Sequence, residues 1–165
     1  MTIQEFYRRR VARKQALTSI HQLSTQFDQL KSTFSPPPRL DYSGPTPNDT
    51  TSIATSPESF TLALSVPPSP EGAEYPTETP KSGPRLAFNS NNKVVHEYIE
   101  NLNRLLVKLD RVESGGDASV RERRKQMIKD VEAEAQRMDR WIAAVWNLAN
   151  PRSRTQPEYQ RNPRP

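Results

Sequence analysis

The sequence predicts an all-α fold: an antiparallel three-helix bundle with a long disordered insertion, rich in Pro, Ser and Thr, between the first and second helices. Three observations predict it. Apolar residues recur at helical spacing in three separate segments, twelve of the sixteen prolines lie within residues 36–84, and two adjacent glycines separate the last two segments. We therefore expect a first helix within residues 1–34, a disordered linker over 35–88, a helical hairpin over 89–149 and a disordered basic tail over 150–165.

The first helix is expected over residues 2–34, because apolar residues three or four positions apart line one of its faces. They are Ile20, Leu23, Phe27, Leu30 and Phe34. Pro36 ends this helix, since the residue before a proline avoids helical geometry.

The insertion has too little apolar content to fold alone. Its one apolar island is SFTLALSV, residues 59–66. This island could form a short strand or dock on the bundle, and we expect it to be mobile.

The second helix is expected over residues 90–113 and the third over 119–149. Their apolar stripes are Val95, Ile99, Leu102, Leu106 and Leu109, then Val120, Met127, Val131, Ala135, Met138, Ile142 and Val145. Gly115 and Gly116 are expected to close the second helix in left-handed geometry. Residues 119–122 fit a capping box that opens the third helix. Trp141 is expected to cover the end of the bundle. Trp146 could pack against the first helix or be partly exposed, and we expect it to pack.

The first helix is expected to join the hairpin because two facing apolar stripes leave their flanks exposed. Closing the 54-residue connection (36–89) costs roughly 2 kcal/mol more than an ordinary short one. Burial of one or two large apolar side chains, at about 1.5–3 kcal/mol each, offsets this.

Composition excludes several classes of protein. The chain of 165 residues has no cysteine, so disulfides, thiolate metal sites and cysteine nucleophiles are absent. No apolar run approaches the ~18 residues of a membrane helix, and no secretory signal is recognisable. We therefore expect a cytoplasmic protein that can also be nuclear. His21 and His96 lack a second ligand at helical spacing, and pairs such as Glu132 and Glu134 are interpreted as solvated surface. We expect no enzyme, no cofactor and no metal.

The basic cluster that opens the third helix could bind nucleic acid, be a solvated helix face, or dock on another protein. Residues 85–149 are almost balanced in charge, with a net charge of +2 within a chain total of +5. The cluster is interrupted by Glu122 and has no interleaved aromatic residue to stack on bases. Nucleic acid is therefore the poorest partner of the three.

The N-terminus fits the spacing IQxxxRxxxxR at Ile3, Gln4, Arg8 and Arg13, which resembles the IQ motif. The resemblance implies a helical ligand for calmodulin or a related EF-hand protein, with the arginines meeting an acidic rim. Arg9 replaces the usual glycine, and Ala16 stands where a larger apolar residue is common.

Residues 93–139 resemble the BAG domain, a family of chaperone regulators. The matching features are YIE (98–100), LLVKLD (105–110), a short turn and VRERRK (120–125). The segment SIHQLSTQFDQLKSTF resembles the family's first helix, displaced here by the linker. An IQ motif ahead of a BAG first helix is similar to plant and fungal members.

The resemblance implies binding to the nucleotide-binding (ATPase) domain of the seventy-kilodalton heat-shock chaperone. Glu100 and Asp110 match the family's acidic contacts, and Arg124 and Lys125 its basic contacts. Glu132 stands where glutamine is usual. Arg121, Lys125 and Lys129 follow one another every fourth residue and so form a ridge on one helix face.

Two functions are consistent with these features. The first is a monomeric co-chaperone that promotes nucleotide exchange on the heat-shock chaperone. The second is a calmodulin-binding adaptor in which the bundle is structural. A charged face on a purely structural bundle is the remaining alternative.

Overall fold

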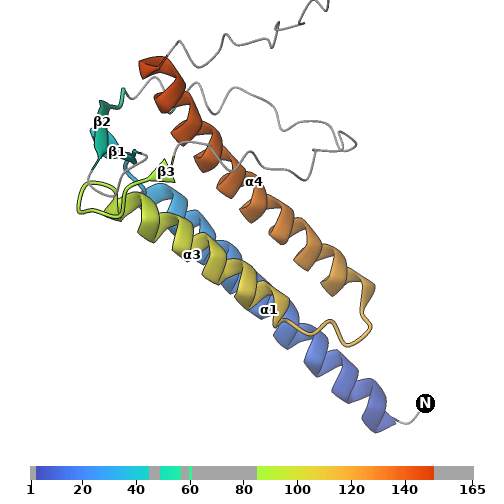
Figure 1. Cartoon of the computed structure of the whole chain (residues 1–165). Coiled ribbons are helices and arrows are strands. Elements are labelled where there is room, and N and C mark those ends of the chain that lie inside the picture. The colour runs from blue at the N-terminus through green and yellow to red at the C-terminus, as the bar shows by residue number, and fades with distance from the viewer. Residues whose placement is uncertain (1–2, 45–48, 57–59, 61–84, 151–165) are drawn as a thin grey trace, which may run out of the picture.

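The computed structural model describes residues 3–44, 49–56, 60 and 85–150, apart from the side chains of Ile3 and Phe6. Three helices dominate it: α1 (Ile3–Thr33), α3 (Lys93–Asp110) and α4 (Ala118–Ala149). Each helix packs against the other two, with α3 and α4 joined by a short turn and α1 lying along both (Figure 1). The three predicted helices and their mutual packing are confirmed.

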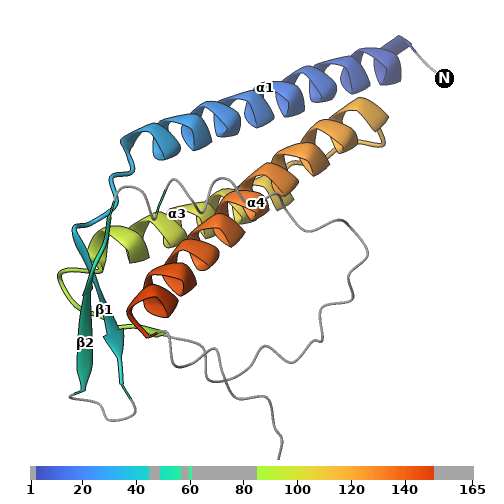
Figure 2. The same cartoon turned by 90° about the horizontal axis from the view of Figure 1, so that it is seen from above.

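The prediction of a purely helical fold with a disordered insertion is wrong, because part of the insertion forms an antiparallel sheet. Strands β1 (Arg39–Ser43), β2 (Thr50–Ala54) and β3 (Arg85–Leu86) are arranged in the order β2-β1-β3. In register, Leu40 faces Ile53 and Tyr42 faces Leu86. Seen from above, the sheet stands at one end of the bundle, and the α3–α4 turn and the N-terminus of α1 lie at the other (Figure 2).

Side chains from β1 hold the sheet to the bundle. Leu40 and Tyr42 are fully buried, and the Tyr42 hydroxyl donates a hydrogen bond of 2.8 Å to the Ile142 carbonyl of α4. The ring of Tyr42 lies 5.0 Å from that of Trp146. Trp146 therefore packs on β1, which corrects the expectation that it packs on the first helix.

A polar cluster joins the middle of β1 to the start of α3. The buried Asn92 side chain donates to the carbonyls of Asp41 (2.6 Å) and Ala87 (2.8 Å) and accepts from the Asp41 amide. The Asp41 carboxylate accepts hydrogen bonds from Asn89 and Asn91. These bonds give partners to both the oxygen and the nitrogen of the buried Asn92 amide, so its burial carries little penalty.

The core follows the predicted stripes, with some additions. Buried residues of α1 include Ile20, Leu23 and Phe27; those of α3 and α4 include Val95, Leu102, Leu109, Val120, Val131, Met138 and Val145. Tyr98 and Leu105 are also buried in α3, while Ile99 and Leu106 are only partly buried. Trp141 is fully buried near the sheet end of α4.

Of the predicted linker, residues 45–48, 57–59 and 61–84 lie outside the described residues, as does the predicted basic tail apart from Asn150. Phe60 is thus the one described residue of the apolar island. Within the described part of the chain, no helix is both long enough and apolar enough to cross a membrane.

Candidate functional site

The turn between α3 and α4 sets the relative position of the two charged helix faces. Gly115 and Gly116 have φ of 55° and 82°, a left-handed geometry that favours glycine. They lie in the turn rather than at the end of α3, which finishes at Asp110 with Arg111 as its C-cap. The glycine cap predicted for the second helix is therefore wrong, although the predicted left-handed geometry is present.

Asp117, not Ser119, begins α4. Its Oδ1 accepts hydrogen bonds from the amides of Ser119 (2.9 Å) and Val120 (3.1 Å), so it satisfies two amide groups that a helix start leaves free. The hydrogen bond from the Ser119 hydroxyl and those from the two amides hold the pKa of Asp117 below its usual value. The predicted capping box is corrected to an aspartate cap two residues earlier.

Two predicted contacts of α3, Glu100 and Asp110, are exposed. Glu100 accepts a hydrogen bond of 3.0 Å from Arg104 one turn later. Between the two acids lies Val107, an apolar side chain that is 51% exposed. Both carboxylates are thus open to solvent, as contacts with a partner protein require.

On α4, the predicted contacts Arg121, Lys125, Lys129 and Glu132 are all exposed. The opposite flank of α4 carries Ser119, Arg123, Gln126 and Asp130, which line a groove against α1. Since successive residues turn the helix by about 100°, the exposed ridge lies on the flank away from α1 and beside α3. We call this surface, with Glu100 and Asp110, the hairpin face.

Arg124 differs from the other predicted contacts. Its side chain is half-buried, and Nη1 donates a hydrogen bond of 2.7 Å to the Val112 carbonyl in the turn. This bond holds the end of the turn against α4. Arg124 therefore has a structural role here, whereas Lys125 next to it is exposed.

An ionic cluster that the sequence did not predict lies between α3 and α4. Glu134, interpreted above as solvated, is 6% exposed and accepts hydrogen bonds from the Tyr98 hydroxyl (2.5 Å) and from Arg137 Nε (2.8 Å). Burial alone raises the pKa of Glu134, but the hydrogen bonds from Arg137 and Tyr98 outweigh it, so the pKa lies below its usual value. Its position on the apolar stripe, three residues after Val131 and four before Met138, is the only local signal of burial.

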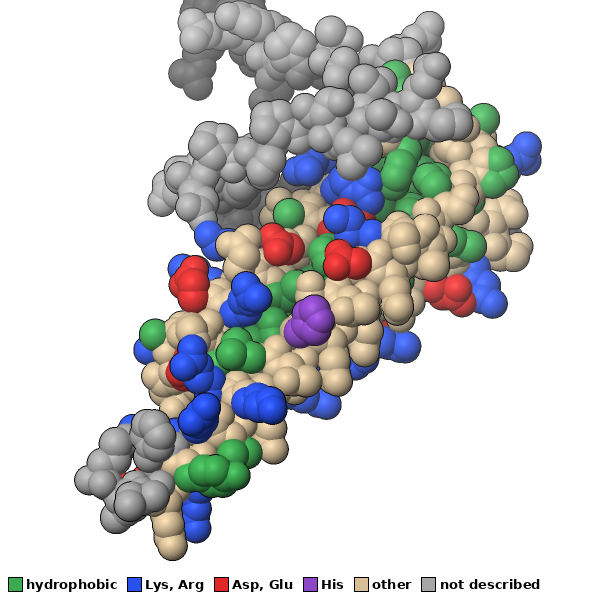
Figure 3. All heavy atoms as spheres, turned by 180° about the vertical axis from the view of Figure 1, so that it is seen from behind, with side chains coloured by type: hydrophobic (Ala, Val, Ile, Leu, Met, Phe, Trp, Pro, Cys, Tyr) green, Lys and Arg blue, Asp and Glu red, His purple; other side chains and the backbone are tan. Residues whose placement is uncertain are grey.

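The N-terminal part of α1 extends past the α3–α4 turn (Figure 1). Gln4, Arg8 and Arg13 of the predicted IQ-like motif are exposed; the Ile3 side chain lies outside the described atoms. Arg13 Nε lies 3.3 Å from the Asp117 carboxylate, and Ala16 is the first buried residue among the described side chains of α1. Lys and Arg side chains gather over this end of the molecule (Figure 3).

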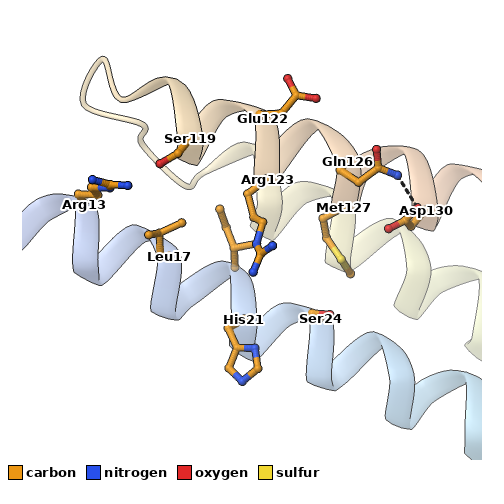
Figure 4. Close-up of a pocket in the computed structure, with 11 residues that line it drawn as sticks. Arg13, Leu17, His21, Ser24, Ser119, Glu122, Arg123, Gln126, Met127 and Asp130 are labelled. Atoms are coloured by element: carbon orange, nitrogen blue, oxygen red, sulfur yellow. Dashed lines mark hydrogen bonds between the residues drawn. The ribbon is translucent and has the colours of Figure 1, made fainter.

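A groove of about 820 Å³ runs between α1 and α4, on the flank of α4 away from the hairpin face. Figure 4 shows Leu17 of α1 on the side that faces Arg123 and Met127 of α4, whereas the His21 ring points away from α4. None of the predicted chaperone contacts lines this groove. Among the described residues, no group of three or more His, Asp or Glu side chains could hold a metal ion.

Comparison with known protein families gives one result that bears on the hairpin. The family model of the BAG domain matches residues 70–141, which include β3, α3 and α4 as far as Trp141 but not α1. No curated protein and no solved structure matches the chain.

Proposed function

Since this chain contains a BAG domain and so belongs to that family, we propose that the hairpin face binds the nucleotide-binding domain of the seventy-kilodalton heat-shock chaperone and promotes nucleotide exchange. At the level of the family, the BAG domain implies a regulator of this chaperone. The finer proposal concerns which residues of this chain make the contact.

One observation supports the hairpin face most strongly. Its charged side chains of both signs are exposed on α3 and α4 within the segment that matches the family, while the helices beneath are joined by a buried core. A rigid surface with charges of both signs provides register and specificity toward a folded partner. The exposed Val107, between Glu100 and Asp110, adds an apolar contact of the kind that is protected from water at the centre of an interface.

The proposed mechanism is differential affinity. If the hairpin face binds the open form of the nucleotide-binding domain more tightly than the closed form, the chaperone population shifts toward the open form. Nucleotide then leaves faster, because the open cleft makes fewer contacts with it. The hairpin needs no catalytic group for this activity.

Binding of chaperone to single variants tests the residues. Asp110→Ala and Lys125→Ala should each weaken binding about 5- to 30-fold, or about 1–2 kcal/mol, measured by titration calorimetry. The matched control is Asp28→Ala, which removes an exposed acid from α1, outside the hairpin face, and should leave the affinity unchanged. Equal affinity of all variants and wild type would remove the hairpin face as the contact surface.

Arg124→Ala separates structure from binding. Because Arg124 bonds to the turn, this variant should lower the melting temperature as well as the affinity, whereas Lys125→Ala should lower only the affinity. Thermal unfolding followed by circular dichroism distinguishes the two.

A second function is proposed for the free end of α1, because described side chains from Gln4 to Gln15 are exposed and basic residues predominate there. We propose that this end binds calmodulin or a related EF-hand protein. The double variant Ile3→Ala/Gln4→Ala should lose calmodulin in a pull-down with and without calcium, while Gln22→Ala, farther along the exposed side of α1, should retain it. If both variants retain calmodulin, or if neither does, the proposed calmodulin site is rejected.

A further inference from the structure

Phe60, the one described residue between Ser56 and Arg85, lies among side chains of α4 and that of Phe34, which directly follows α1. Its ring centroid lies 5.8 Å from that of Phe34 at the end of α1, and 5.3 Å from that of Trp141 on α4, which it meets edge-on at 90°. The guanidinium of Arg137 lies over the Phe60 ring at 4.5 Å. We call Phe34, Arg137 and Trp141 the aromatic socket.

The aromatic socket is held together by contacts that do not involve Phe60. Arg137 is fixed by its ion pair with the buried Glu134, which also accepts a hydrogen bond from Tyr98. The ring of Phe34 packs against that of Tyr98 at 4.1 Å. The socket is therefore preorganised by the three helices, and a preorganised site loses less entropy when a ligand enters.

Phe60 fills this socket incompletely. Its side chain is only partly buried, and the buried indole Nε1 of Trp141 donates no hydrogen bond to any described residue. A buried donor without an acceptor is unusual, and the backbone carbonyl of a bound peptide would satisfy it. Edge-on aromatic contact and a cation over the ring together select an aromatic side chain.

From these contacts we infer that the aromatic socket is a peptide-binding site for an aromatic side chain, and that Phe60 is its displaceable intramolecular occupant. A peptide bearing a phenylalanine would compete with Phe60 for the same three side chains. Its apparent dissociation constant would equal the intrinsic constant divided by the fraction of molecules in which Phe60 has left the socket.

The position of the socket allows it to act alongside the hairpin face. Trp141 is nine residues beyond Glu132 on α4, so the two side chains lie about 180° apart around the helix. The open groove between α1 and α4, with Met127 and Asp130 among its lining, is on the same side of α4 as the socket. A peptide on this side leaves the hairpin face uncovered.

The test uses the full chain carrying Trp146→Phe, so that Trp141 is the one remaining tryptophan of the two. The probes are a synthetic peptide with the sequence of residues 52–66 and the same peptide with alanine at the position of Phe60. Protein with Phe60→Ala should bind the phenylalanine peptide saturably, with a shift in Trp141 fluorescence, and bind the alanine peptide at least tenfold more weakly. Protein that retains Phe60 should bind the phenylalanine peptide at least tenfold more weakly than the Phe60→Ala protein.

Two further variants control the test. Phe88→Ala removes a phenylalanine that is 93% exposed and should bind peptide no better than protein with Phe60 in place. Phe60→Leu, checked like the others for helical circular dichroism, should give intermediate peptide affinity because it keeps an apolar side chain without the ring. Three outcomes would overturn the inference. The two peptides could bind equally well, neither Phe60→Ala nor Phe60→Leu protein could bind the phenylalanine peptide, or proteins with and without Phe60 could bind it equally well. The chaperone is absent from this test, so its outcome is independent of the proposed exchange activity.

Discussion

Glu134 shows how one side chain can be misinterpreted from sequence. Among the many acidic residues of the third helix it has no local feature that distinguishes it from the exposed Glu132, apart from its place on the apolar stripe. Its burial depends on Tyr98, which is 36 residues earlier and on another helix. A pattern within one helix cannot reveal that partner, so the ionic cluster emerges only when α3 and α4 are packed together.

The lowered pKa of Glu134 predicts acid sensitivity. A carboxyl whose pKa is lower in the folded state than its ordinary value of 4.5 stabilises the fold above that value, and this contribution is lost as the pH falls through the folded pKa. Glu134→Gln should therefore lower the free energy of unfolding by about 1–3 kcal/mol at pH 7, because it weakens a buried, charge-assisted set of hydrogen bonds. The same variant should also lose less unfolding free energy than the wild type when the pH falls from 6 to 3.

Urea unfolding at the two pH values measures both effects. Glu132→Gln is the matched control, since it makes the same chemical change at an exposed position of the same helix. A Glu134→Gln protein whose stability falls with acid as steeply as the wild type would show that Glu134 is not a source of the pH dependence.

The strands were the least predictable elements. The helices follow from apolar residues every three or four positions, and their observed bounds of 3–33, 93–110 and 118–149 lie close to the predicted 2–34, 90–113 and 119–149. By contrast, β1 is five residues long, follows three prolines and pairs with β3 more than forty residues later. Its stability comes from Tyr42 and Asn92 contacts that join distant segments, and no local pattern encodes these.

Attachment of β1 to α4 through Tyr42 gives a direct test of the sheet. Tyr42→Phe removes the hydrogen bond to the Ile142 carbonyl and should cost about 1 kcal/mol of unfolding free energy. Tyr42→Ala also removes a fully buried ring and should cost about 3–5 kcal/mol.

Tyr7 provides the control, because it is 68% exposed and Tyr7→Phe should change stability by less than about 0.5 kcal/mol. Chemical unfolding compares the three variants. If Tyr42→Ala were as harmless as Tyr7→Phe, the sheet would not be fastened to the bundle in solution.

In the whole molecule, the sheet changes how α1 is joined to the hairpin. The predicted cost of closing a 54-residue connection assumed a flexible linker. In the structure α1 ends at Thr33 and β1, which is fixed to α3 and α4, begins at Arg39. The connection from α1 to the rest of the fold is therefore only residues 34–38, and the cost of closing a long connection falls on residues 55–84, between β2 and β3.

The exposure of the predicted contact residues could be inferred from the sequence only in part, for physical reasons. Exposed charges on a helix follow from its periodicity, so the positions of Glu100, Asp110 and Lys125 on outer faces could be inferred from the sequence. Arg124 could not be separated from Lys125 in this way, because its hydrogen bond to Val112 depends on the path of the turn. The aromatic socket brings Phe34, which directly follows α1, against two residues of α4, and it too was beyond local patterns.

The most direct measurement of the central claim is the rate at which labelled nucleotide leaves the chaperone's nucleotide-binding domain when the full chain is added. The wild-type chain should accelerate release, the double variant Asp110→Ala/Lys125→Ala should lose most of that acceleration, and Asp28→Ala should keep it. A wild-type chain that leaves the release rate unchanged, or a double variant that accelerates release as well as the wild type, would contradict the assignment of the hairpin face.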